Sequence, residues 1–284
     1  MNTLIACIAH QYTLFMTLLG TMILGSTCGA LGVFAVLRKQ SLLGDTISHA
    51  ALPGIAGALL LTSSSNPVIL LGGGALAGCI GVLLFMLVKQ TTRLKTDTIL
   101  GIILSVFFGL GLVLITIIQK HPIPHQAVIN KFLFGSAATL LPTDIYVMSI
   151  ASCIALLSLI TWWRSFSICT FDPSFAHTIG YNVRIVDIGI TALLVLTIVI
   201  GLQTVGVILM SSLLIAPAAA ARQWTHNLHT LVMLAALIGA GSGIVGSCIS
   251  SYYTHMPTGP CIVVVLSICV FVSLLVTRSR IQSY

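Results

Sequence analysis

An aspartate and a histidine stand four residues apart in an apolar stretch of the chain, as Asp45 and His49 within residues 44–54. Residues four apart on a helix share one face, so this carboxylate and this imidazole can be directed at one point. Both ligand types suit zinc, manganese or ferrous iron. An ionisable group inside an apolar segment is costly and usually marks a transport pathway or a partner. The pair therefore predicts a metal-binding position in a pathway.

A simpler interpretation of the same two residues stays open. Asp45 could cap the helix while His49 donates to a backbone carbonyl near the membrane interface. Two ligands are also too few for a tight site. A symmetric dimer would bring two such pairs together on its axis and supply four ligands, so the metal hypothesis favours a dimer.

Four further histidines are weaker metal-binding candidates. His121 and His125 fall in a proline-containing loop on the expected outer side, where they could accept metal from a delivering protein. His226 and His229 would share one face if residues 224–230 were helical, on the side where metal would leave. For both pairs the alternative is an ordinary solvated histidine.

The composition indicates a chain dissolved in lipid. Of its 284 residues 57% are hydrophobic and only 6% are charged, which leaves too little polar surface for a water-soluble globule of this size. All five acidic residues are Asp, so the net charge of +7 reflects scarce acids. The basic residues lie between apolar segments and form no continuous stripe, which argues against nucleic acid as a partner. We expect an all-α, polytopic transmembrane helical bundle forming a single domain over residues 1–284.

Nine apolar stretches reach the length of about 20 residues that a bilayer core about 30 Å thick requires of a helix. Only Gln203 and Thr204 separate the sixth from the seventh, so a broken or re-entrant pair, and a count of eight or ten, stay open there. The predicted spans are Thr13–Leu37, Leu43–Leu61, Val68–Val88, Thr98–Ile118, Ile145–Trp163, Val186–Leu202, Val205–Ala221, Leu231–Ser251 and Cys261–Val276.

The distribution of Lys and Arg predicts the orientation, because cytoplasmic loops are rich in them. An outside N-terminus leaves only Lys120 and Lys131 on the outer side. An odd number of spans then puts the C-terminus in the cytoplasm. The residues assigned to the cytoplasmic side are Arg38, Lys39, Lys89, Arg93, Lys95, Arg164, Arg184, Arg222, Arg278 and Arg280.

The stretch Leu-Gly-Asp-Thr-Ile-Ser-His-Ala-Ala-Leu-Pro-Gly at residues 43–54 resembles a signature of the zinc/manganese/iron permease subunits of ATP-binding-cassette importers. The resemblance continues in the same order over roughly 240 residues, which makes accident an inadequate explanation. The further segments that carry it are residues 132–136 followed by Asp144, residues 171–180, 205–209, 214–222 and 250–259.

This resemblance implies the architecture of a type II importer in a bacterial inner membrane. Its expected partners are cytoplasmic ATP-binding subunits, an extracytoplasmic metal-binding protein and a second permease subunit, which is identical or closely related. Membrane lipid surrounds the chain as a further partner. No cofactor is expected to stay bound, and the zinc, manganese or iron ion is cargo. The sequence has no Gly-x-x-x-x-Gly-Lys-Ser/Thr phosphate loop. We therefore expect a transport subunit that is not itself an enzyme, with ATP hydrolysis in a partner.

The resemblance also implies a coupling helix that docks on the ATPase, in the short segment from Asp172 to Gly180. An Asp-Pro pair at its start and a Gly at its end predict a helix of one or two turns. Ser174 stands where the family usually has an acidic residue. The alternative is a mere interfacial connector. The residues assigned to coupling are Asp172, Pro173, Ser174, Phe175, Ala176 and Gly180.

Two other function classes compete with this one. A secondary metal transporter or channel would share the hydrophobicity and could use Asp45 for ion coupling, without any need for an ATPase. A membrane-embedded metalloenzyme is disfavoured, because a chain without Glu has no His-Glu-x-x-His site and no nucleophile–base pair is apparent.

Overall fold

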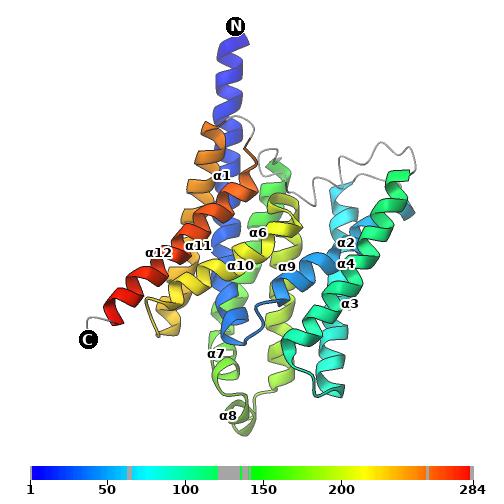
Figure 1. Ribbon diagram of the computed structural model, residues 1–284, viewed down its shortest axis with the longest axis vertical. Coiled ribbons are helices and arrows are strands. Elements are labelled where there is room, and N and C mark those ends of the chain that lie inside the picture. The colour runs from blue at the N-terminus through cyan, green and yellow to red at the C-terminus, as the bar shows by residue number, and fades with distance from the viewer. Residues whose placement is uncertain are drawn as a thin grey trace. The chain divides into compact units, whose positions relative to one another are not determined.

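The computed structural model describes residues 2–62, 66–120, 135, 140, 142–253 and 256–281, and within these ranges every regular element is an α-helix (Figure 1). Seven of the nine predicted spans each fall within one helix, whereas Ile145–Trp163 and Val205–Ala221 each cross a boundary between two helices. The helices are α1 (Asn2–Leu37), α2 (Leu43–Thr62), α3 (Pro67–Thr91), α4 (Thr96–Lys120), α6 (Pro142–Thr161), α7 (Trp163–Phe171), α8 (Pro173–Thr178), α9 (Val183–Val205), α10 (Val207–Arg222), α11 (Leu228–Tyr252) and α12 (Thr258–Ile281).

The chain divides into two compact units that alternate along the sequence. Unit 1 contains residues 1–36, 136–163 and 212–284, and unit 2 contains residues 37–135 and 164–211. Helices α2, α3, α4 and α9 belong to unit 2, whereas α1, α6, α11 and α12 belong to unit 1. The expectation of one domain over residues 1–284 stays a prediction.

In unit 2, α2 is the central helix and packs along α3 and α4, with α9 beside α2 and α3 (Figure 1). Small residues allow these close contacts. The Cα of Gly54 faces the backbone of Gly73 so closely that no Cβ would fit at either position. On the other side, Gly111 of α4 lies against Leu52 and Pro53 of α2. Helices approach in this way in membranes, where close van der Waals packing drives association.

In unit 1, small residues of α1 meet α11 in the same manner. Gly25 lies against the backbone of Gly239, and Gly29 against that of Ala235. A buried hydrogen bond of 3.0 Å joins the hydroxyls of Thr21 and Ser247 along this contact. Unit 1 is thus held by backbone approach together with buried polar links.

The surface of both units is apolar over long stretches, as expected for helices surrounded by lipid. On α3, Leu76 is 69% exposed and Leu83 is 60% exposed, values that would mark an aggregation surface in water. Seven described helices are long and apolar enough to cross a membrane, namely α1, α3, α4, α6, α9, α11 and α12. The remaining two predicted spans fall on α2, which carries several polar side chains, and on α10, whose 16 residues extend only about 24 Å. The count of nine stays a prediction.

The boundary between α9 and α10 lies at Gly206, and Gln203 and Thr204 are still helical. Gly206 has φ 86° and ψ 164°, a conformation essentially restricted to glycine, and its N–H bonds to the carbonyl of Leu202. The apolar stretch is therefore broken, as one alternative allowed, but two residues later than the polar pair suggested.

Candidate functional site

Helix α2 begins directly after a short turn in which the N–H of Leu43 bonds to the carbonyl of Gln40 at 3.0 Å. Asp45 lies in the first turn, where a negative charge is favoured by the helix dipole. Thr46, beside it, donates to the carbonyl of Leu42 at 2.8 Å and approaches that of Leu100 in α4 at 3.3 Å. The start of α2 is thus anchored by the hydrogen bonds of Thr46 rather than by one to the Asp45 carboxylate.

His49 lies one turn further along the same face. Its ring packs edge-on against the ring of Phe108 of α4, with centroids 4.8 Å apart and an interplanar angle of 74°. Its Nδ1 is buried without a hydrogen-bond partner, and so is the hydroxyl of Ser48. Within the described part of the chain, neither Asp45 nor His49 makes a hydrogen bond, so the capping alternative is not what the structure contains. The face therefore holds three polar groups at positions i, i+3 and i+4.

Pro53 changes the backbone hydrogen bonding of α2 one turn beyond His49. A proline within a helix has no N–H, so the carbonyl of the residue four positions earlier loses its partner. That residue is His49. Gly111 of α4 lies against the proline ring, which keeps the two helices close at this point. The carbonyl of His49 therefore lacks its usual helical hydrogen bond, next to the imidazole of the same residue.

These groups do not form a complete metal site by themselves. No cluster of three or more His, Cys, Asp or Glu side chains occurs among the described residues. Asp45 and His49 supply two ligands, and an ion held there needs others from water, backbone oxygens or a second chain. Such an arrangement suits an ion in passage better than a resident one.

The short helix predicted at residues 172–180 is confirmed as α8. Asp172 caps it, with a carboxylate oxygen accepting from the N–H of Phe175 at 2.9 Å, and Pro173 occupies the first position. This N–H stabilises the ionised carboxylate and holds the pKa of Asp172 below its ordinary value. The helix ends at Thr178, and Gly180, two residues later, has φ 93° and donates to the carbonyl of His177.

The side chains of α8 separate into a buried one and several exposed ones. Ala176 is fully buried, whereas Phe175 is 55% exposed and Ile179, just past the helix, is 53% exposed. Ser174 is exposed as well. The helix therefore rests on Ala176 and presents apolar side chains outward. A further helix, α7, precedes it after a break at Trp162 and was not predicted, because nearly all of its residues lie beyond the apolar stretch that defines the predicted span.

The weaker histidine candidates have different outcomes. His121 and His125 lie outside the described residues. His226 and His229 do not share a helical face, because residues 225–227 are not helical and α11 begins at Leu228. The cause is Asn227, whose side chain accepts from the N–H of His229 at 3.2 Å and caps the helix there.

His229 instead stacks on Trp163, with ring centroids 4.3 Å apart and an interplanar angle of 24°.

Two polar features of the structure, a serine and an ion pair, were not predicted from the sequence. Ser48 lies within the quoted motif, where its i+3 spacing from Asp45 was a usable signal. The ion pair of Arg38 with Asp187, at 2.7 Å, joins residues far apart in sequence, and the only signal was an aspartate inside an apolar stretch.

A family model described as the ABC 3 transport family matches residues 10–277. The chain belongs to the ABC 3 transport family. The sequence resemblance to metal permeases is thereby confirmed.

Individual relatives agree with this family. The chain is 45% identical over 270 residues to the zinc transport system membrane protein TroC of Treponema pallidum, covering 95% of this chain and 91% of TroC. It is 40% identical over 263 residues to the manganese transport system membrane protein MntC of Bacillus subtilis, covering 93% of this chain and 60% of the length of MntC. Its fold is similar to a chain of PsaBC from Streptococcus pneumoniae, solved in complex with Fab, with a TM-score of 0.80, 29% identity and coverage of 92% of this chain and 90% of that one.

Proposed function

We propose that this member of the ABC 3 transport family is the membrane-spanning permease subunit of an ATP-driven importer for a divalent transition metal, zinc, manganese or iron. The observation that carries the proposal is the polar face of α2. Asp45, Ser48 and His49 lie on one side of a helix in an apolar chain, and within the described residues the Ser48 hydroxyl and the His49 Nδ1 are buried without a hydrogen-bond partner. Unpaired buried polar atoms cost stability, so their presence argues for a ligand.

The metal ion is the cargo, and no resident cofactor is needed. An ion with water still bound can exchange some of that water for the Asp45 carboxylate and the His49 imidazole, then leave because two ligands hold it weakly. A second permease subunit, identical or closely related, would supply another such pair. The names of relatives include a zinc and a manganese system, and the ligand types suit either metal.

ATP-binding subunits are the proposed partners at α8. The helix is short, capped at both ends and exposes Phe175, which suits a rigid element that fits into a groove of another protein. Closure of two ATPase subunits would then displace α8 and, through its contacts with α9, the helices of unit 2. An extracytoplasmic metal-binding protein would deliver the ion on the opposite side.

The proposed orientation has an outside N-terminus and a cytoplasmic C-terminus. Cysteines introduced into a variant without the native ones would test it. Cysteine at Ser174 should cross-link to the ATPase and resist an impermeant reagent applied from outside. Cysteine at Asn66, the exposed cap of α3, should show the opposite behaviour. Outside labelling at position 174 would show that the orientation is inverted.

The decisive experiment is metal uptake into proteoliposomes that contain the permease, its ATPase and the delivery protein. ATP should drive uptake, and uncouplers that collapse the proton gradient should leave it unchanged. Uptake without ATP that disappears with uncouplers would instead identify a secondary transporter, the competing class that could also use Asp45.

A further inference from the structure

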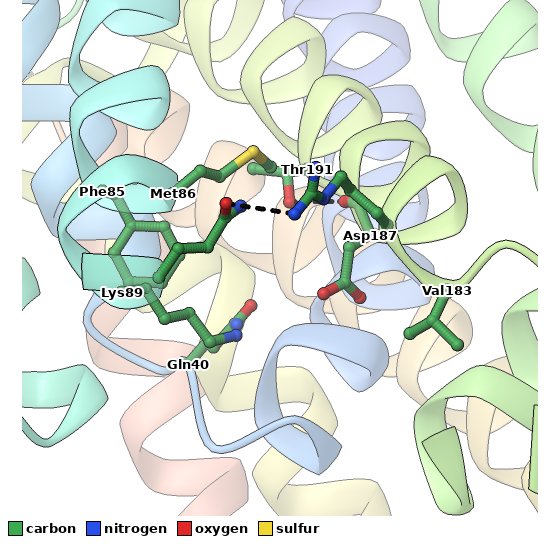
Figure 2. Close-up of a pocket in the computed structure, with 9 residues that line it drawn as sticks. Gln40, Phe85, Met86, Lys89, Val183, Asp187 and Thr191 are labelled. Carbon is green, nitrogen blue, oxygen red and sulfur yellow. Dashed lines mark hydrogen bonds between the residues drawn. The ribbon is translucent and has the colours of Figure 1, made fainter. Parts of the chain in front are cut away.

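A polar cavity lies in unit 2 where α3 ends and α9 begins, and neither Asp45 nor His49 lines it. Its volume is about 280 Å³, near the lower limit of about 300 Å³ for small-molecule pockets. Figure 2 shows that its side chains come from three segments: the turn before α2, the last turns of α3 and the first turns of α9. The polar residues among them are Gln40, Lys89, Gln90, Arg184, Asp187 and Thr191.

Two cations of this cavity have no carboxylate partner within the described ranges. The Lys89 ammonium lies 5.7 Å from the centre of the Phe85 ring, so an aromatic face holds it at the wall. Arg184 donates to the amide oxygen of Gln90 at 3.2 Å, and this bond uses only one of its five N–H groups. Both groups therefore keep most of their donors for a ligand.

The one carboxylate that lines the cavity is already neutralised. Arg38, whose side chain is only 7% exposed, donates from Nη1 to Asp187 at 2.7 Å and from Nε to Thr170 at 3.1 Å. The lining with Arg38 included thus carries an excess of two positive charges, from Lys89 and Arg184. A cation would be repelled by this excess, whereas an anion would be attracted.

Gln40 adds a neutral donor to the cavity. Its residue is only 7% exposed, and its side chain lines the cavity. The amide N–H₂ can donate to a ligand oxygen there. The first turn of α9, with Arg184, adds the positive end of a helix dipole.

The position of the cavity relates the anion to the membrane. Lys89 lies at the end of the apolar span of α3, and Arg184 lies at the beginning of that of α9, so both are at the level of lipid headgroups. Leucines 83 and 87 of α3 are exposed beside it, as are isoleucines 185 and 188 of α9. Acyl chains can lie along these surfaces while the phosphate enters the cavity.

We propose that the cavity bounded by Gln40, Lys89 and Arg184 binds the phosphate of an anionic phospholipid. The bound lipid joins α3, α9 and the turn before α2 next to α8. The proposal is independent of the transported metal, since none of these residues belongs to the Asp45 and His49 face.

The test measures binding of phosphatidylglycerol to the purified full-length permease by native mass spectrometry, with phosphatidylcholine and inorganic phosphate as competing probes. The double variant Lys89→Gln/Arg184→Gln should raise the apparent Kd for phosphatidylglycerol about thirtyfold. The matched control is Arg93→Gln/Lys95→Gln, which removes the same charge from exposed positions next to α3 but outside the cavity. This control should change the Kd little.

Two further variants separate charge from folding. Lys89→Arg/Arg184→Lys keeps both charges and should retain the lipid, whereas Gln40→Glu, which places a carboxylate in the cavity, should weaken it. Unchanged binding in both the double variant and Gln40→Glu would overturn the proposal, and so would an equal loss in the Arg93/Lys95 control. Equal affinity for phosphatidylcholine, or complete displacement by inorganic phosphate, would show that the ligand is not an anionic lipid. Loss of ATPase assembly with unchanged lipid binding would identify a protein-docking site instead.

Discussion

Two short helical stretches of unit 2, the first turns of α2 and the whole of α8, differ in whether their polar side chains have hydrogen-bond partners. In α8, the Asp172 carboxylate accepts from a backbone N–H, and the hydroxyl of Thr178 donates to a carbonyl. In α2, the hydroxyl of Ser48 and the Nδ1 of His49 are buried without partners. The polar groups of α8 serve its own folding, whereas those of α2 are left available. Satisfied and unsatisfied polar groups thus distinguish a structural segment from a binding one.

The largest expected effect concerns α2, where two polar groups lack hydrogen-bond partners. Asp45→Ala/His49→Ala should lower metal uptake at least about a hundredfold, because even changes outside the ligand set reduce metal affinity by about 10- to 100-fold. Membrane insertion and ATPase assembly should persist, since both changes make α2 more apolar. Isotope uptake into proteoliposomes measures the effect. Asp97→Ala, at an exposed position in the first turn of α4, is the matched control and should import normally.

Normal uptake by the Asp45→Ala/His49→Ala variant would remove α2 from the pathway. A loss of similar size in Asp97→Ala would mean that any aspartate in the first turn of a helix is needed for uptake. The unpaired polar groups of α2 would then no longer identify it as the binding segment.

The next effect tests the surface of α8. At the sequence level, Phe175→Asp and Ala176→Arg are equivalent disruptions, but the structure separates them. Phe175 is 55% exposed, so its replacement should weaken ATPase binding about thirtyfold, as expected for an aromatic anchor, without changing the melting temperature. Ala176 is fully buried, so Ala176→Arg should lower that temperature by overpacking.

Co-purification of the ATPase and thermal melting of the permease alone measure these two quantities. Unchanged ATPase binding in Phe175→Asp would leave α8 as an interfacial connector. A lowered melting temperature in Phe175→Asp would show that its side chain is part of the packing of unit 2.

A smaller effect compares two hydroxyls in one turn of α2. The Ser48 hydroxyl has no partner, so Ser48→Ala should increase the free energy of unfolding by about 1 kcal/mol or more. Thr46 donates to a carbonyl, so Thr46→Val should decrease that free energy by about 1 kcal/mol. Unfolding in mixed micelles measures both changes. A decrease in Ser48→Ala would indicate that its hydroxyl is hydrogen-bonded in the membrane.

The smallest effect concerns the cap of α8. The pKa of Asp172 is lowered in the folded chain, so its stabilising effect is complete above the unfolded value near 3.8 and is lost as the pH falls through the lower folded value. Hydrogen exchange of the amides of Phe175 and Ala176 should therefore show less protection at such low pH. Asp172→Asn keeps a cap and removes this pH dependence, whereas Asp172→Ala should lower protection at every pH. The same pH dependence in Asp172→Asn would assign it to another group.

Most helices could be predicted from the sequence because each is an apolar stretch of suitable length between polar residues. The α8 helix could also be predicted, since Asp172, Pro173 and Gly180 are local signals at its ends. The break at Trp162 and the exact position of the break at Gly206 could not. A single residue with a different backbone conformation leaves hydropathy unchanged, and a glycine with positive φ has the same letter as one that merely packs.

The polar face of α2 was predicted only in part. Helical spacing correctly put Asp45 and His49 on one side, because that relation is local. Whether a polar atom has a partner depends on neighbouring helices, so the unpaired state of Ser48 and the packing of Phe108 on His49 could not be derived. The pairing of Arg38 with Asp187 was inaccessible for the same reason.

The alternation of the two units along the chain bears on how the protein is made. Unit 2 contains nothing beyond residue 211, so a ribosome that has delivered α9 and the first turn of α10 has supplied all of it. Unit 1 instead needs α1 from the beginning of the chain together with α11 and α12. During synthesis, the face of α1 that carries Gly25 and Gly29 therefore lacks its partner α11 until the other unit has been completed. Until then, this exposed face of α1 can form non-native contacts with other helices, which chaperones of membrane insertion would prevent.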